Sequence, residues 1–192
     1  MKTALVIVDM QMMMQDRIDS GRDHVNPDAA ANITVIVDHF RKTGQPVVHV
    51  RHCDDTTGSP LHPDAPSYQP MPCAIENDGE PIFIKTTSSA FASTELETWL
   101  RSEGITDIVM TGAVASFCVN SAVRAGCDLG FNMHVVRDGV IDFDLPDAGL
   151  EAKTIFDVTM GLLEADFAEI VTTSALIENA AADANTRRVS GN

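Results

Sequence analysis

The chain has 192 residues, of which 44% are hydrophobic and 21% are charged, so its composition predicts one globular domain with a substantial core. Its formal net charge of −15 argues against non-specific binding to nucleic acid and against docking on anionic membranes. The sequence contains no run of about 18 apolar residues, the length that a membrane-spanning helix needs. These features leave a small molecule as the expected partner.

The beginning of the chain and its cysteines both indicate a cytoplasmic protein. Asp9 interrupts the first apolar run and no small-residue cleavage site follows, so this run is not predicted to be a signal peptide. The four cysteines lack the spacing of a secreted disulfide scaffold. The sequence has no C-x-x-C pair, which argues against a structural zinc site.

The first half of the chain predicts two strands, a helix and a long loop. The continuous apolar run at residues 4–8 is typical of a strand that is covered on both faces. A helix is expected to begin at Asn26-Pro27, with a cap and a first-turn proline, and to end at Gly44. Residues 46–51 form a second predicted strand. The Pro-, Ser- and Asp-rich residues 54–78 have no periodicity and are expected to be a lid or binding loop.

The second half continues to alternate strands with helices. The remaining predicted strands are residues 81–84, 107–111, 132–137 and 168–171. Helices are expected from Ser93 or Thr94 to Gly104, from Ser116 past Gly126, around residues 155–162 and, as a last turn, at residues 174–177. Gly112 is expected to break the strand at residues 107–111, and residues 138–146 are expected to be a loop.

This alternation predicts an α/β fold, a three-layer α/β/α sandwich around a mostly parallel, roughly six-stranded, Rossmann-like sheet. Residues 1–177 are expected to form a single domain, and residues 178–192 a polar C-terminal tail. Ligands of such sheets bind outside the carboxyl ends of the strands, where the strand order reverses.

Cys118 lies where the strand at residues 107–111 gives way, through a sharp turn, to a helix. Ser116 is a candidate N-cap for that helix, and the free N–H groups of the first helical turn favour a thiolate there. A strand, a turn and a nucleophile at a helix start is the layout of a nucleophile elbow. The alternative is that Cys118 is a small buried hydrophobic residue.

Two further reactive residues fall at strand ends. Asp9 follows the first strand and Lys85 follows the third; alone, the first would be a turn aspartate and the second a solvated strand end. Because the carboxyl ends of parallel strands meet at one edge, we expect Asp9, Lys85 and Cys118 to converge. Three histidines, His49, His52 and His62, are candidate metal ligands, but without an H-x-H or D-x-H pattern they are better interpreted as polar or core residues.

Four segments together resemble one family, the isochorismatase-like cysteine hydrolases, which include nicotinamidases and N-carbamoylsarcosine amidohydrolases. The segments are A-L-V-I-V-D-M-Q at 4–11, V-V-H-V-R-H at 47–52, I-K-T-T-S-S-A-F at 84–91 and M-T-G-A-V-A-S-F-C-V at 110–119. They preserve the order, spacing and chemistry of an Asp, a Lys and a Cys.

The resemblance implies an Asp9–Lys85–Cys118 triad that hydrolyses a C–N bond of a small amide, ureido or carbamoyl compound through a thioacyl intermediate. Lys85 would favour the ionised forms of its neighbours, Asp9 would act as general base, and Cys118 would attack the carbonyl carbon. The resemblance also implies a cis peptide between Ala113 and Val114, an oxyanion hole of the backbone N–H groups of Val114 and Cys118, and a homodimer or larger homo-oligomer.

The sequence departs from some members of that family. Metal-binding nicotinamidases carry an Asp-x-His group after the second strand, where this chain has H-V-R-H-C-D-D, so we expect no catalytic metal and no cofactor. The candidate substrate contacts are Met14, Arg51, Phe91 and Phe117, with Arg51 as an anchor for a carboxylate; each has an equally plain structural interpretation. Met12, Met13 and Met14 would line a pocket or fill the core.

Two alternatives to the amidohydrolase stay open. The first is a non-catalytic member of the same fold that binds a metabolite or acts as a scaffold; the presence of all three triad positions argues against it. The second is thiol redox chemistry at Cys118, which the missing C-x-x-C and the distance to Cys127, nine residues further on, make less favoured.

Overall fold

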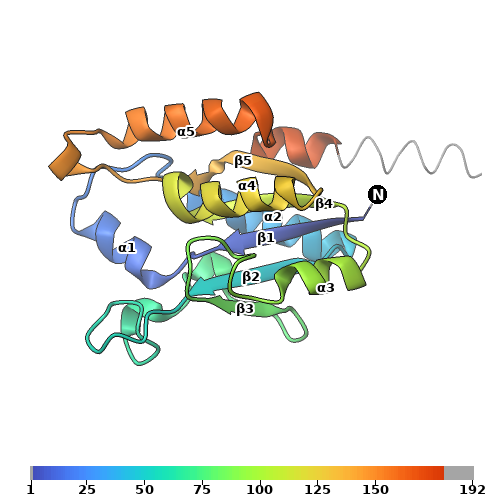
Figure 1. Cartoon of the computed structure of the whole chain (residues 1–192), viewed down its shortest axis with the longest axis horizontal. Coiled ribbons are helices and arrows are strands. Elements are labelled where there is room, and N and C mark those ends of the chain that lie inside the picture. Colours follow the sequence, from blue (N-terminus) through green and yellow to red (C-terminus); the bar gives the residue numbers. More distant parts are fainter. Residues whose placement is uncertain (1, 180–192) are drawn as a thin grey trace, which may run out of the picture.

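A six-stranded parallel sheet forms the centre of the molecule (Figure 1). The structure is a computed structural model, and it describes residues 2–179. The strands are β1 (Thr3–Val8), β2 (Val47–His52), β3 (Ile82–Lys85), β4 (Asp107–Ala113), β5 (Asn132–Ile141) and β6 (Glu169–Val171). Their order is β3-β2-β1-β4-β5-β6, and every neighbouring pair is parallel.

Helices cover both faces of this sheet because the side chains of its central strands alternate between two buried layers. Leu5 and Ile7 of β1 pack on the face covered by α1 (Met12–Asp19) and α2 (Ala29–Thr43). Val6 and Val8 pack on the other face, under α3 (Leu96–Ser102), α4 (Asn120–Asp128) and α5 (Ala152–Asp166). Figure 1 shows α3 and α4 in front of the sheet and α2 behind it. The three-layer α/β/α arrangement predicted from the sequence is confirmed.

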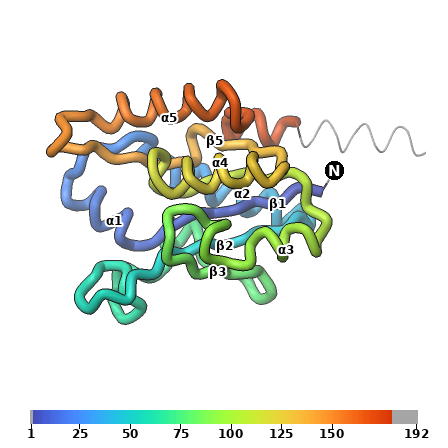
Figure 2. The backbone as a smooth tube through the Cα atoms, in the orientation of Figure 1, coloured from blue at the N-terminus to red at the C-terminus, as the bar shows by residue number. Residues whose placement is uncertain are grey.

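The strand order reverses between β1 and β4, the two central strands. From β1 the chain moves outward to β2 and β3, and from β4 it moves outward to β5 and β6. The carboxyl ends of β1 and β4 therefore flank the crevice in which such sheets bind ligands. In the trace of Figure 2, α1 and the long loop after β2 lie at this end of the sheet.

Two predicted strand ends are wrong, for one shared reason. β4 does not stop before Gly112 but runs to Ala113, and β5 runs to Ile141 instead of ending at residue 137. The two extensions pair with each other, Gly112 with Val140 and Ala113 with Ile141. Gly112 has a φ of +122°, and a Cβ there would lie 2.0 Å from the carbonyl oxygen of Val8, so only glycine lets β4 pass β1 this closely.

The helices differ from the sequence prediction at their beginnings. α1 was not predicted, since only Met14 of its eight residues is buried and no capping side chain precedes it. α2 ends before Gly44 as expected but begins at Ala29, because Asn26 has a φ of +56° and its side-chain amide donates to the carbonyls of Arg137 and Val140 at 2.7 Å. The last helical segment covers residues 173–179, and the rest of the predicted tail, residues 180–192, lies outside the described residues.

The loop after β2 contains only two short 3-10 turns, Pro66–Tyr68 and Pro72–Ala74. It is fixed to the end of β1 by backbone hydrogen bonds from Met12 to Gln69 and from Met71 to Met10, each 2.8 Å long. Within residues 2–179, no helix is both long and apolar enough to cross a membrane.

Candidate active site

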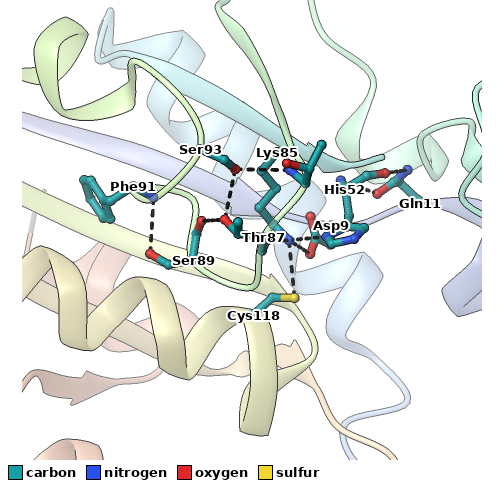
Figure 3. Close-up of polar contacts among 10 residues, drawn as sticks. Asp9, Gln11, His52, Lys85, Thr87, Ser89, Phe91, Ser93 and Cys118 are labelled. Carbon is teal, nitrogen blue, oxygen red and sulfur yellow. Dashed lines mark hydrogen bonds and ion pairs between the residues drawn. The ribbon is translucent and has the colours of Figure 1, made fainter. Parts of the chain in front are cut away.

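Three reactive side chains meet at the carboxyl edge of the sheet, each at or after the end of a different strand (Figure 3). Asp9 directly follows β1, Lys85 is the last residue of β3, and Cys118 belongs to a π-helical turn, Ala115–Val119, between β4 and α4. The Lys85 Nζ lies 2.7 Å from Asp9 Oδ2 and 3.3 Å from Cys118 Sγ. The structure thus brings together all three residues that the sequence analysis singled out.

Lys85 is the centre of this cluster. Its side chain is fully buried, although lysine is rarely buried unless its charge is paired. Besides Asp9 and Cys118, its Nζ contacts His52 Nδ1 at 2.8 Å and the carbonyl oxygen of Thr87 at 3.1 Å. An ammonium has three N–H donors, so these four acceptors leave none of its donors without a partner.

Burial controls the protonation of the two groups beside Lys85. Burial raises the pKa of Asp9 above its ordinary value of 3.8, and the Lys85 ammonium opposes this rise. Burial also raises the pKa of the Cys118 thiol to about 11, and the Asp9 carboxylate adds to the rise while Lys85 opposes it. At neutral pH the Cys118 side chain is therefore a thiol, and not the thiolate expected from its place near a helix start.

The backbone at Asp9 is held in an unusual conformation. Its φ is +52°, and its N–H donates to the carbonyl of Val50 at 2.9 Å. Positive φ at a non-glycine residue is uncommon and persists only where the surrounding structure imposes it. Oδ2 accepts from Lys85, whereas the second oxygen, Oδ1, is buried without a hydrogen-bond partner among the described residues and is available to accept the Cys118 proton.

The turn that carries Cys118 is braced by a buried carboxylate. Ser116, predicted to cap the helix, instead donates to Asp142 twice: from its hydroxyl to Oδ1 at 2.9 Å and from its N–H to Oδ2 at 3.1 Å. Asp142 follows β5, is fully buried, and also accepts from the N–H of Phe143 at 3.0 Å. This carboxylate therefore ties the nucleophile turn to the end of β5.

A cavity of about 380 Å³ opens beside Asp9 and Cys118. Apolar side chains from α1, from the loop after β2 and from the segment after β5 make most of its wall, and two arginines and two aspartates add charge. The lining residues are Asp9, Gln11, Met13, Met14, Arg17, Arg22, His52, Leu61, Ala113, Val114, Phe117, Cys118, Phe143, Asp144 and Leu145. This is the size and character of a small-molecule site.

Comparison with known proteins assigns the chain to a family. The isochorismatase domain family matches residues 3–182. The chain belongs to the isochorismatase family. It is 33% identical over 181 residues to the uncharacterized isochorismatase family protein YrdC of Bacillus subtilis (strain 168), covering 93% of this chain and 96% of YrdC.

A solved structure and a named enzyme are also similar to this chain. A crystal structure of an isochorismatase-family protein from Chromobacterium violaceum ATCC 12472 superposes with a TM-score of 0.86 and 26% identity, over 92% of each chain. The N-carbamoylsarcosine amidase of Arthrobacter sp is 35% identical over 77 residues, 36% of this chain and 29% of that enzyme.

The peptide bond between Ala113 and Val114 is cis. This is the position that the sequence resemblance implied. Val114 and Cys118, the two residues whose backbone N–H groups are expected to form an oxyanion hole, both line the cavity.

Two of the four predicted substrate contacts do not reach the cavity. Met14 and Phe117 line it. Arg51, predicted as a carboxylate anchor, pairs with Glu76 and does not line this cavity. Phe91 does not line this cavity either: its ring stacks on Phe131 with the centroids 6.0 Å apart, within the packing of the core.

His52 and Gln11 are site residues whose roles the sequence analysis missed. His52 was interpreted as a polar or core histidine, yet it lines the cavity and contacts Lys85; burial and the lysine charge lower its pKa, which favours neutral imidazole. Gln11 donates to the carbonyls of His52 and Tyr68 at 3.1 and 2.9 Å and accepts from the His52 N–H at 2.8 Å. The sign that the sequence offered for Gln11 was a polar amide two residues after Asp9, close to the end of a buried strand.

One group of side chains in the described part of the chain has the composition of a metal site. Ligand atoms of Asp9, His52 and Cys118 lie within 4.8 Å of one another. However, the Lys85 ammonium contacts each of these three residues. A metal cation would have to displace this charge, so the donor set does not fit a metal while Lys85 is protonated.

Proposed function

We propose that this chain is a cysteine-dependent amidohydrolase that cleaves a C–N bond of a small amide, ureido or carbamoyl compound. The observation that carries the proposal is the position of Lys85 Nζ, 2.7 Å from Asp9 Oδ2 and 3.3 Å from Cys118 Sγ, at the edge of a cavity of about 380 Å³. A base, a nucleophile and a fixed cation that stabilises the base are the parts that acyl transfer requires.

The reaction begins with proton transfer from Cys118. With its pKa raised to about 11, the thiol is protonated at neutral pH and needs a base. Asp9 accepts the proton as Sγ attacks the carbonyl carbon, and its own raised pKa makes it a stronger base than an exposed aspartate. Lys85 stays charged throughout and stabilises whichever of its two neighbours is anionic.

The tetrahedral intermediate carries its negative charge on the former carbonyl oxygen. The backbone N–H groups of Val114 and Cys118 are proposed to donate to this oxygen, a contribution worth about 3 kcal/mol of barrier for one donor in comparable enzymes. Asp9 then returns the proton to the leaving nitrogen, the C–N bond breaks, and an amine or ammonia departs, leaving a thioester on Sγ.

Hydrolysis of the thioester regenerates the enzyme. A water molecule attacks the thioester carbon while Asp9 removes one of its protons, and collapse of the second tetrahedral intermediate breaks the C–S bond. Asp9 returns the proton to the sulfur, and the carboxylic or carbamic acid leaves. The name of the related N-carbamoylsarcosine amidase supports the amide and carbamoyl class for this chain.

Ammonia release from a panel of small primary amides, carbamoyl acids and ureido acids tests the proposal. The wild type is compared with Cys118→Ala and with Cys127→Ala, which removes a thiol that does not line the cavity. We expect the wild type to release ammonia. Cys118→Ala should lower the rate of release at least about 10³-fold, and Cys127→Ala should leave it unchanged. Equal turnover in wild type and Cys118→Ala would contradict the mechanism, and no turnover in either, with unchanged ligand binding, would favour a non-catalytic binding protein.

A further inference from the structure

Two arginines line the catalytic cavity of a chain whose net charge is −15. Arg17 belongs to the last turn of α1, and Arg22 lies in the connection from α1 to α2. Their guanidinium carbons lie 5.4 and 5.7 Å from the centroid of the Phe143 ring. An acidic protein repels anions at long range, so two cations beside its active site need a local explanation.

The two arginines differ in their partners. Arg22 is neutralised by Asp144: its Nε lies 2.8 Å from Oδ1, and its Nη2 donates to the Asp144 carbonyl at 2.7 Å. The Arg17 side chain makes no ion pair and no hydrogen bond to any residue in the range 2–179 that the structure describes. With Arg22 paired, Arg17 leaves this part of the cavity with one uncompensated positive charge.

The surroundings of Arg17 are unfavourable to its own charge. Partial burial and the nearby Arg22 guanidinium lower the pKa of Arg17, while the charge of Cys118 in its thiolate form opposes this effect. A half-buried cation without a counter-ion is costly, and a bound anion would remove that cost. Arg17 and Cys118 line the same cavity, so an anion bound at Arg17 could belong to the molecule that reacts with the nucleophile.

We propose that Arg17 binds a carboxylate of the substrate, so that the compounds hydrolysed are amides, ureas or carbamoyl derivatives that also carry an acid group. The planar guanidinium fork matches a carboxylate in two-point geometry, and a single uncompensated charge matches a monoanion. Apolar Met13, Met14 and Phe143 would then contact the carbon chain between the two ends. The inference rests on the proposed function only for the nature of the scissile group.

A pair of alkylating reagents of matched size and different charge tests the anion site without requiring amide hydrolysis. Iodoacetate and iodoacetamide differ in one charge, and both convert the Cys118 thiol to a thioether with loss of iodide. The quantity measured is the ratio of their inactivation rates, with the label located on Cys118 by mass spectrometry. We expect the iodoacetate-to-iodoacetamide ratio to fall about tenfold in Arg17→Gln, as for loss of a charge-assisted hydrogen bond.

Arg101→Gln is the matched control. It removes the same unit charge and the same kind of contact, since Arg101 lies 4.9 Å from the centroid of Phe131, but it does not line the cavity. Its ratio should equal that of the wild type. Equal ratios in all three proteins would overturn the carboxylate site.

Steady-state hydrolysis separates the inference from the proposed function. Succinamate and butyramide present the same amide with and without a carboxylate. We expect Arg17→Gln to raise KM for succinamate about tenfold, to leave kcat within twofold, and to leave butyramide unaffected. Turnover with no preference for the acid and no effect of Arg17→Gln would overturn the anion site and leave the hydrolase standing.

The remaining outcomes are also decisive. A charge-dependent alkylation ratio without hydrolysis of any amide would support the anion site and contradict the amidohydrolase. If neither reagent labels Cys118 and no amide is hydrolysed, the inference falls together with the function on which it rests.

Discussion

The inner and outer parts of the cavity are built in different ways. Asp9 and Lys85 lie at the carboxyl ends of β1 and β3, and both side chains are buried. Arg17 lies in the last turn of α1, and Phe117, which is 50% exposed, lies beside Cys118 in the turn between β4 and α4. The comparison teaches that the base and the cation are fixed at strand ends, whereas the groups that would recognise a substrate lie on a helix and a turn outside the sheet, which can vary between relatives.

Removal of the central cation should have the largest effect. Lys85→Met leaves the buried Asp9 carboxylate without its ion-pair partner, so the pKa of Asp9 should rise further. We expect a loss of about 10³-fold in kcat/KM and of about 3 kcal/mol in the free energy of unfolding, measured by urea denaturation. The double variant Lys85→Met/Asp9→Asn, with both charges gone, should recover stability but no activity; recovery of activity would contradict the role of Asp9 as base.

The wild-type pH profile tests the same inner groups. Only ionised Asp9 can accept the thiol proton, and burial raises its pKa above 3.8. kcat/KM should therefore fall as pH is lowered, about tenfold per unit below that pKa, with a midpoint above 3.8. Circular dichroism over the same range shows whether the protein stays folded. A midpoint at or below 3.8 would contradict the assignment.

A smaller effect is expected from the brace of the nucleophile turn. Asp142→Asn places an amide donor opposite the hydroxyl or the N–H of Ser116, both of which now donate to Asp142. The shifted turn should lower kcat about tenfold and change KM by a smaller factor, because the wall residues on α1 and in the loop after β2 stay in place. Asp147→Asn, in the exposed turn Pro146–Ala148, is the control. An equal change in kcat and KM would argue against a positioning role.

The smallest effects compare two phenylalanines that the sequence treated alike. Phe117→Ala removes an exposed cavity contact and should raise KM about fivefold with little change in stability. Phe91→Ala removes a ring stacked on Phe131 and should lower the free energy of unfolding by about 2 kcal/mol without changing KM. A higher KM for Phe91→Ala and an unchanged KM for Phe117→Ala would show that Phe91, and not Phe117, lines the cavity.

The sequence could predict the inner part of the site because local signals and topology act together there. The apolar runs locate the strands, parallel pairing brings their carboxyl ends to one edge, and Asp9, Lys85 and Cys118 follow. Arg17 could not be found in the same way. α1 has no capping side chain, and the direction of Arg17 depends on packing against Phe143, which is distant in the sequence.

The protonation of Cys118 shows a second limit of sequence analysis. Its place near a helix start predicts a thiolate, yet burial and the Asp9 carboxylate raise its pKa. Desolvation is a property of the assembled site, so no local pattern reveals it. The end of β4 is similar, because the need for Gly112 arises from the backbone of β1, with which β4 pairs.

The most direct test of the account is detection of the thioacyl enzyme. Wild-type protein is quenched in acid during turnover of an amide that it hydrolyses, digested, and analysed by mass spectrometry. The account predicts the mass of the acyl group on the peptide that contains Cys118, and no adduct in Cys118→Ala. Turnover that persists in Cys118→Ala, with no adduct on the wild-type peptide, would contradict it.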